Sequence, residues 1–450
     1  MLFYHIYNTH FEITYVSWNG CFIFFPTACR LKYKVLPTGS RIAEYAIIRN
    51  AAPRSQKGVI DIKNIKDKEK ISMENYKDDF ERTYSSLDEI IEDANTSDKR
   101  WETAVIGDLR VAFSDEVMVA PSAEYAKAYN MLKFYADDVT LDAAADTKKH
   151  TGLAVFINGE WRPLRDTAKA SLFNRAGISG PSLGRLEPQV LAEFLNKCLE
   201  LYKKQETLVQ ISDQKVSYLG SDDYCILPIE DIFEAVKKVC DARFPGYRFA
   251  EGYGSHSFTT ARLQFPGQKE LVANYAKLLK EDGHDGEAEK LIPSIKVMTS
   301  DVGLCAARVV VYLDGGKRPI LVGSCLEVDH RAKHTVSDFR DKLDMIYVKF
   351  EEQMKLIEAL HEITITNPVE CMKRVCHALH LPKAASLAVA EMFNDICGNV
   401  PTNAGNIYLY MQDIAMYIEK QESKLRFYEN LERALKIQWT KYDLPGVFNW

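Results

Sequence analysis

The chain has 450 residues, of which 46% are hydrophobic and 27% are charged, and its formal net charge is −6 at pH 7. This composition is typical of a soluble globular protein with two or three domains. The acidic balance argues against a general basic surface for nucleic acid, although a local basic groove is enough to bind it. The ten cysteines form no CxxC pair, which indicates reduced thiols in a cytoplasmic protein. No apolar run reaches the roughly 18 residues that a membrane span needs.

The first 72 residues differ from the rest of the chain. They carry a net charge of +6, which leaves −12 for the remainder, and their many aromatic residues follow neither a helical nor a strand period. Lys68 and Glu69 precede Met73 at a distance that a bacterial ribosome-binding site, AAGGAG, would leave. We therefore expect translation to begin at Met73, with residues 1–72 a spurious or disordered extension. A genuine N-terminal extension is the alternative, and mass spectrometry of the native N-terminus distinguishes the two.

From Met73 onward, strand and helix signals alternate in the first part of the chain. The expected elements up to residue 242 are an acidic helix ending near Asn95, a hairpin in 101–113 turning at Gly107–Asp108, a helix in 121–138, a hairpin in 152–165 turning at Asn158–Gly159, a helix capped by Asp166 and ended by Gly177, a helix from Pro188, a strand pair in 207–221 and a helix in 229–242. Those that follow are strands around a Gly-rich bend in 247–265, a helix in 268–283, an exposed acidic loop in 283–290, and strands in 292–300 and 308–328.

The C-terminal part is expected to be helical. Residues 336–360 predict one long helix with a single apolar stripe, as a bundle or coiled coil needs, formed by Phe339, Leu343, Ile346, Phe350, Met354 and Ile357. The predicted fold is therefore α+β: a mixed α/β core with antiparallel hairpins, followed by a helical C-terminal region. The expected divisions are 73–150 (helix and hairpin), 151–330 (core domain) and 331–450 (helical region).

Three segments resemble a prokaryotic family of unknown function found on phages, plasmids and other mobile elements. They are "LRDTAKASLFNRAGISGPSLGRLEPQVLAEFLN", "KVSYLGSDDYCILPIEDIFEAV" and "IKVMTSDVGLCAARVVVYL" with the downstream "VGSCLEVDHRAKHT". The resemblance covers roughly residues 150–390. It departs where Leu326–Glu327 replace the usual Asn-Gly after Cys325, and where Asp223 replaces an arginine. It implies a mobile-element context in a bacterium and brings no established activity.

The most polar cluster of the sequence is "SCLEVDHRAKH" (324–334). His330 and His334 are four residues apart and would share a helix face, where with a carboxylate of the cluster, which contains Glu327 and Asp329, they could hold a divalent metal. The cluster lacks the glutamate of a zinc-protease helix, so a solvated strand-to-helix junction is the competing interpretation. Asp301, in the bend "TSDVG", completes the catalytic candidates. Cys305, with no adjacent base, is expected to be a small buried side chain.

Two other patterns favour structural roles. In "EGYGSHSF" (251–258), His256 and Ser257 are adjacent and do not make a catalytic pair, so a loop is expected. Residues 371–380 place two cysteines and two histidines on one helix, where the apolar register indicates that the cysteines face the core.

Basic residues interleaved with aromatic ones suggest a groove for single-stranded DNA, in which arginines follow the phosphates and rings stack on bases. The candidates are Trp161, Arg162, Arg165, Arg175, Arg185 and Arg248. Salt bridging at the surface is the alternative role for these arginines.

Three interpretations remain open from the sequence. The first is a DNA-contacting accessory protein of a mobile element, which binds or anneals single strands without chemistry and forms oligomers through its C-terminal helices. The second is a metal-assisted enzyme built on Asp301, Asp329, His330 and His334. The third is a structural or interaction protein that acts through its helices.

Overall fold

The computed structural model describes residues 5–8, 11–18, 21–26, 73–120, 138–331 and 333–450. The chain divides into two compact units, Met1–Lys68 and Glu69–Trp450. The first contains an antiparallel sheet of β1 (His5–Asn8), β2 (Phe11–Trp18) and β3 (Cys21–Pro26). The start of translation at Met73 is not tested by the structure and stays a prediction. The helix predicted in 121–138 falls almost entirely outside the described residues.

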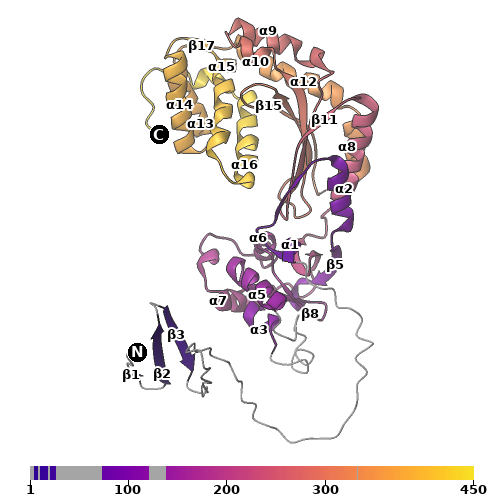
Figure 1. The fold of residues 1–450 in the computed structure, drawn as a ribbon, viewed down its shortest axis with the longest axis vertical. Coiled ribbons are helices and arrows are strands. Elements are labelled where there is room, and N and C mark those ends of the chain that lie inside the picture. Colours follow the sequence, from indigo (N-terminus) through magenta and orange to yellow (C-terminus); the bar gives the residue numbers. More distant parts are fainter. Residues whose placement is uncertain (1–4, 9–10, 19–20, 27–72, 121–137, 332) are drawn as a thin grey trace, which may run out of the picture. The chain divides into compact units, whose positions relative to one another are not determined.

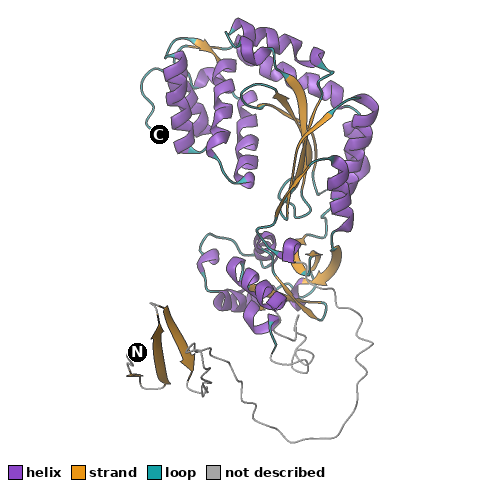
Figure 2. Cartoon of the chain, viewed as in Figure 1, coloured by secondary structure: helices purple, strands orange, loops and turns teal. Residues whose placement is uncertain are grey.

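The second unit is α+β with antiparallel sheets and a helical C-terminal region, so the predicted fold class is confirmed (Figures 1 and 2). It contains two large, separate hydrophobic cores. We call the part around the core from Ala104 to Leu219 the small lobe. The large lobe surrounds the core that includes Leu87, Ile90 and residues from Leu227 to Trp439. The chain therefore passes between the lobes after Ile90 and again after Leu219.

In its described residues, the small lobe combines two three-stranded sheets with four α-helices. One sheet has the order β10-β9-β5 and the other β6-β7-β8. The strands are β5 (Lys99–Val105), β6 (Arg110–Phe113), β7 (Leu153–Ile157), β8 (Glu160–Pro163), β9 (Glu206–Ser212) and β10 (Lys215–Gly220). The helices are α3 (Ser114–Met118), α5 (Asp138–His150), α6 (Asp166–Arg175) and α7 (Pro188–Leu199).

The hairpin predicted at Asn158–Gly159 is confirmed, whereas the one predicted at Gly107–Asp108 is wrong. Asn158 and Gly159 both have positive φ (50° and 95°), as a two-residue type I′ turn requires. At Gly107 the chain instead enters a short 3₁₀ turn, and β5 pairs with β9 while β6 pairs with β7. The free edge of β6 is satisfied by Asn196, whose side-chain amide bonds both the N–H and the carbonyl of Val111. The alternation of apolar and polar residues therefore predicted where these strands lie, but not which strands pair with each other.

Buried charges tie the segment before β4 (Glu81–Tyr84) to the small lobe. Lys215 is fully buried, and its Nζ donates to carboxylate oxygens of Asp78 and Asp146, each at 2.7 Å. Arg165 is also fully buried, and its guanidinium lies 3.6 Å from Asp78 and 3.5 Å from Asp213. Two cations thus share three carboxylates in the interior. Arg165 cannot reach a DNA strand from this position, so the structure is at odds with its predicted place in a DNA groove.

The large lobe is built on a six-stranded antiparallel sheet with the order β15-β14-β13-β12-β11-β4. Its strands are β4 (Glu81–Tyr84), β11 (Arg248–Ser255), β12 (Thr259–Gln264), β13 (Ile292–Thr299), β14 (Ala307–Asp314) and β15 (Ile320–Val328). The Gly-rich bend predicted near residue 252 is part of β11. Gly252 and Gly254 leave room for the Tyr84 side chain of β4, which a Cβ at either position would approach to within 2.8 Å.

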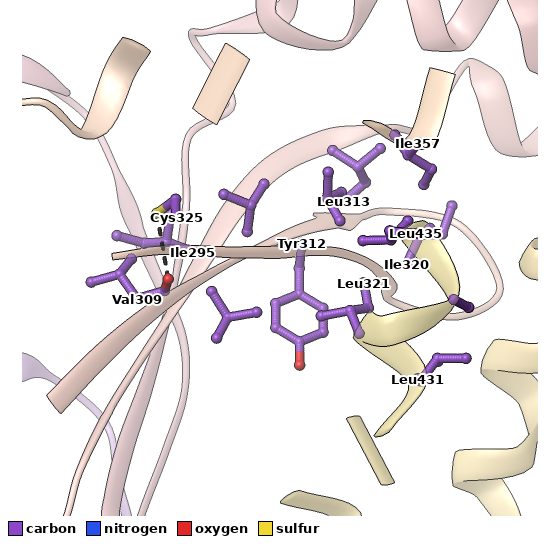
Figure 3. Packing of buried hydrophobic residues seen from close by; sticks show 14 of the residues in the cluster. Ile295, Val309, Tyr312, Leu313, Ile320, Leu321, Cys325, Ile357, Leu431 and Leu435 are labelled. Carbon is purple, nitrogen blue, oxygen red and sulfur yellow. Dashed lines mark hydrogen bonds between the residues drawn. The ribbon is translucent and has the colours of Figure 1, made fainter. Parts of the chain in front are cut away.

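Both faces of the sheet are covered, so every residue of β14 is buried. On one face, the Arg308 guanidinium pairs with glutamates of α16 (Gln421–Glu432), and the Tyr312 ring meets the Tyr428 ring edge-on. Figure 3 shows the packing around β14 and β15, where the Cys325 thiol donates to the Val309 carbonyl at 3.4 Å. In Figure 1, α8 (Ile229–Arg243) and α2 (Leu87–Thr96) lie on the other side of the sheet from α16.

The single long helix predicted for 336–360 is broken into α11 (Val336–Leu343) and α12 (Ile346–Ala359). At the break, Arg243 of α8 donates to the freed carbonyl of Asp344. The whole predicted stripe is buried within the large lobe, with no member more than 3% exposed. Because this stripe is covered by the chain itself, it is not free to form the predicted coiled coil or an oligomer contact.

Besides short 3₁₀ turns, eight further α-helices and strands belong to the described residues. They are α1 (Met73–Tyr76), α9 (Ala273–Glu281), α10 (Asp285–Ala288), β16 (Thr364–Ile365), α13 (Pro368–Ala378), α14 (Lys383–Cys397), β17 (Thr402–Asn403) and α15 (Ala404–Met411). The loop predicted at 283–290 contains α10, in which Glu287 is buried beside Arg318 rather than exposed. Among all the residues that the structure describes, no helix has the length and apolarity needed to cross a membrane.

Candidate functional site

A cavity of about 640 Å³ lies between the two lobes, and one face of α6 forms its wall. We call it the α6 pocket. The helix lines it with three adjacent pairs of side chains that repeat every four positions: Asp166, Thr167, Ala170, Ser171, Asn174 and Arg175. The opposite wall comes from the bend 302–306, the segment 329–331, Ser257 and Glu422. Its volume is in the range of about 300–1,000 Å³ that ligand sites occupy.

The predicted Asp166 cap is displaced by one position. Arg165 is the N-cap and makes no side-chain cap bond, while Asp166 is the first residue of α6. The C-terminal prediction is confirmed, because Gly177 has φ of 68° just beyond the helix. This register places an aspartate at one end of the pocket-facing side of α6 and an arginine at the other.

Four rings from three parts of the chain meet beside the pocket. The Tyr224 ring lies 5.6 Å from Trp101 of β5, 4.9 Å from Tyr218 of β10 and 5.1 Å from His330, with which it is stacked at 1°. The Tyr224 hydroxyl donates to the backbone carbonyl of Asp301 at 2.9 Å. The cluster therefore joins the small lobe to the bend after β13 and to the segment after β15.

His330 is 6% exposed and forms part of the pocket wall. Its Nδ1 lies 3.0 Å from the carbonyl of Cys225, and its Nε2 is buried without a hydrogen bond to any described residue. Burial lowers the pKa of His330, while the nearby backbones of Cys225 and Cys305 and the charge of Asp301 partly oppose this shift. The Cys305 backbone is thus close, yet it makes no well-formed bond to Nε2. The ring is neutral at neutral pH and has one nitrogen to spare.

Two arginines line the pocket near Tyr218. Neither Arg175 nor Arg331 has a carboxylate within ion-pair distance among the described residues, and both positive charges act on the Tyr218 hydroxyl. Burial is the larger influence and raises the pKa of Tyr218, so the phenol stays protonated. Gly303, at φ of 66°, brings the opposite wall close, since a Cβ there would lie 3.0 Å from the Tyr218 hydroxyl. We call this the arginine end.

The other end of the pocket is acidic. Ser257 donates its hydroxyl to Glu422 at 2.6 Å, and the Glu422 charge acts on Asp166. Asp166 is exposed as a residue, but partial burial of its carboxylate raises the pKa of Asp166; Lys169 opposes this rise, and the charges of Asp78 and Glu422 add to it. Neither carboxylate has an ion-pair partner in the described part of the chain. We call this the acidic end.

The predicted catalytic residues are only partly brought together. Asp329 and His330 line the α6 pocket, but the Asp301 carboxylate makes an ion pair at 2.7 Å with Lys99 of β5. Asp301 instead borders a smaller cavity of about 60 Å³ with Gln210, Asp213 and His256. Asp301 thus bridges the lobes structurally, and its carboxylate is not free in the pocket.

The predicted metal pair is not on a helix. His330 and His334 precede α11, and His334 lies 3.8 Å from Asp338 rather than beside His330. In the described ranges, the residues close enough to share an ion are Asp79, Asp146 and His150. These already contact Lys149 and Lys215, which compete with a cation.

The cysteine candidates are buried in the core. Burial raises the pKa of Cys305, Cys371 and Cys376 to about 12, so these thiols are protonated at neutral pH. The two expectations that Cys305 is a small buried side chain and that the 371–376 cysteines face the core are confirmed. A thiolate nucleophile or soft-metal ligand would require the charged form that burial disfavours.

Of the six residues predicted for a DNA groove, Arg175 alone lines the α6 pocket. Arg162 pairs with Glu160 on β8, and the neighbouring Trp161 ring lies 5.4 Å from Phe156. Arg185 and Arg248 are exposed and lie outside the pocket lining. The six residues therefore do not form one site around this cavity.

Sequence reasoning missed most of the pocket. Tyr218, Tyr224, Arg331 and Glu422 come from segments far apart in the chain, and no local motif connects them. The polar face of α6 was the available signal, since it repeats at helical spacing opposite the buried Ala168 and Leu172. This pattern predicts that α6 presents a polar face, but it does not predict which residues lie opposite that face.

No protein-family model, curated protein or solved structure matches this chain. The resemblance to a mobile-element family therefore remains a prediction, and the function is argued below from the pocket itself.

Proposed function

We propose that this protein is a non-enzymatic accessory protein of a mobile element that binds single-stranded DNA, and that the α6 pocket holds part of the strand. The observation that carries the proposal is the arginine end: Arg175 and Arg331 lack carboxylate partners in the described residues and both lie near Tyr218. An arginine without an internal partner can give its N–H groups to a phosphate. An adjacent tyrosine offers a face on which an unpaired base stacks.

The pocket also favours an unpaired strand over a duplex. A cavity of about 640 Å³ accommodates a nucleotide or two, whereas a base within a duplex is covered by its neighbours and its partner. Catalysis is less well supported, because Asp301 is engaged by Lys99 and the pocket thiol of Cys305 is held protonated. Binding requires only what the pocket offers: cations, rings and donors.

Fluorescence anisotropy with a labelled single-stranded 20-mer tests the proposal at increasing salt. We expect binding at low salt that weakens as salt rises, with a slope of about −0.7 for each phosphate contact. An unlabelled duplex should compete poorly. R175A should lower the affinity by about tenfold, which equals about 1.4 kcal/mol, and should make the slope shallower by one contact.

R248A is the matched control, because Arg248 is an exposed arginine outside the pocket lining. It should leave the affinity within about twofold. The proposal is overturned if the protein does not bind the oligonucleotide at low salt, or if R248A weakens binding as much as R175A does.

A further inference from the structure

The α6 pocket has opposite charges at its two ends, and α6 sets the distance between them. Asp166 and Arg175 are the first and last residues of α6 and both line the cavity. Nine steps of an α-helix at about 1.5 Å each separate them by about 13 Å along the axis. A ligand that fills the pocket lengthwise therefore meets guanidinium groups at one end and carboxylates at the other.

The acidic end has unused capacity to accept hydrogen bonds. The Asp166 carboxylate has no hydrogen-bond or ion-pair partner in the described residues, and Glu422 receives a bond to one oxygen from Ser257. An ionised carboxylate accepts hydrogen bonds and donates none. This end repels phosphate, so a nucleotide that places its phosphate at the arginine end presents its base to Asp166 and Glu422.

A second observation marks the same cavity as a place for a ligand. His330 is more than nine-tenths buried in the pocket wall, and its Nε2 has no hydrogen-bond partner among the residues that the structure describes. A buried polar atom without a partner is uncommon in a folded protein, because losing its hydration is costly. The pocket thus combines an unsatisfied ring nitrogen with unpaired charges of both signs.

On the basis of the proposed function, we infer that the acidic end selects bases that carry an exocyclic amino group and discriminates against thymine. Cytosine presents its N4 amino group and adenine its N6 amino group, and both donate to a carboxylate. Thymine presents the O4 acceptor at the corresponding position, which faces the carboxylates with like polarity. The pocket therefore reads one feature of the base while the arginine end holds the strand.

The test compares oligo(dC) and oligo(dT) of 12 nucleotides by anisotropy at pH 7.5, with EDTA present so that no divalent cation bridges the strand to the carboxylates. The wild-type protein should bind oligo(dC) about tenfold more tightly, because a good base contact contributes about 1–3 kcal/mol of discrimination. D166N/E422Q should bring the ratio close to one. E422Q alone, which changes an exposed residue of α16, should reduce it and covers the case in which the double variant fails to fold.

E391Q is the matched control, because Glu391 is an exposed helical glutamate of α14 that lies outside the pocket lining. It should preserve the preference for oligo(dC). The inference is overturned if the wild-type protein binds both oligonucleotides equally, or if the preference survives in folded D166N/E422Q. Equal binding leaves the proposed function standing, whereas binding of neither oligonucleotide overturns the proposed function itself.

Discussion

Removal of the Asp78 carboxylate should strongly destabilise the small lobe. Asp78 is 1% exposed at its side chain, and it contacts both of the fully buried cations, Lys215 at 2.7 Å and Arg165 at 3.6 Å. In D78A these two cations keep, among the described carboxylates, only Asp146 and Asp213, so positive charge is left undercompensated in the interior. Breaking a buried ion pair from one side costs about 3–5 kcal/mol. For a cooperative unit of 150–250 residues this lowers Tm by about 6–20 °C.

Thermal unfolding followed by circular dichroism measures the effect, and the adjacent residue supplies the control. Asp79 is 56% exposed at its side chain and pairs with Lys149, which is 65% exposed. Solvent screens such a pair, so D79A should cost less than about 1 kcal/mol. If D78A unfolds within about 2 °C of D79A, the buried cations do not depend on Asp78 and the reasoning is refuted.

Three further outcomes are expected. Burial lowers the pKa of His256 from 6.5 to about 2, so below about pH 6.5 the unfolded chain binds a proton that the folded chain does not. The contribution of His256 to stability is therefore complete above that pH and is lost on acidification. In urea titrations, H256N should make the loss of stability shallower by about 1.4 kcal/mol per pH unit. An unchanged slope would contradict this. G315A should lower the free energy of unfolding by about 2–3 kcal/mol or more, because Gly315 has φ of 95° and a Cβ would lie 1.7 Å from the Lys290 carbonyl oxygen. G316A, where a Cβ would make only ordinary contacts, should change it by less than about 1 kcal/mol in the same assay. Equal effects of the two variants would rule out the clash. A thiol reagent should label the part-exposed Cys225 in the native protein. Five other cysteines are buried, and burial raises the pKa of each thiol to about 12: Cys240, Cys305, Cys325, Cys371 and Cys376. The reagent should label these five only after unfolding, and labelling of them in the native protein would disprove their burial.

Local chemistry in the sequence predicted the individual elements well. The turn at Asn158–Gly159 needs two residues with positive φ, and the helix from Pro188 has proline at its first turn; both signals act within a few residues. Pairing between strands was harder, as β5 and β6 show. Their alternation fits a hairpin, yet the partner of each strand is chosen by packing against distant segments.

The candidate site could be predicted only in part, for the same physical reason. His330, Asp329 and Arg175 were singled out because their residue types carry chemistry, and they do line the pocket. The role of a predicted residue depends on what faces it: Tyr224 stacks on His330, and Lys99 pairs with Asp301, the predicted residue that does not line the pocket. Such pairings arise from tertiary contacts over more than a hundred residues of chain, which a single sequence does not display.

The edge strand β4 has a consequence for how the chain reaches its fold. Tyr84 of β4 is paired with Gly252 of β11, so the first strand of the large sheet to be synthesised must wait for a partner 168 residues later. At a synthesis rate of about 5–20 residues per second, that delay is roughly 8–34 s. During this time the small lobe, whose strands span residues 99–220, can fold while β4 and α2 stay unpaired. Until β11 emerges, β4 therefore lacks its strand partner and is exposed to capture by a chaperone or by another nascent chain.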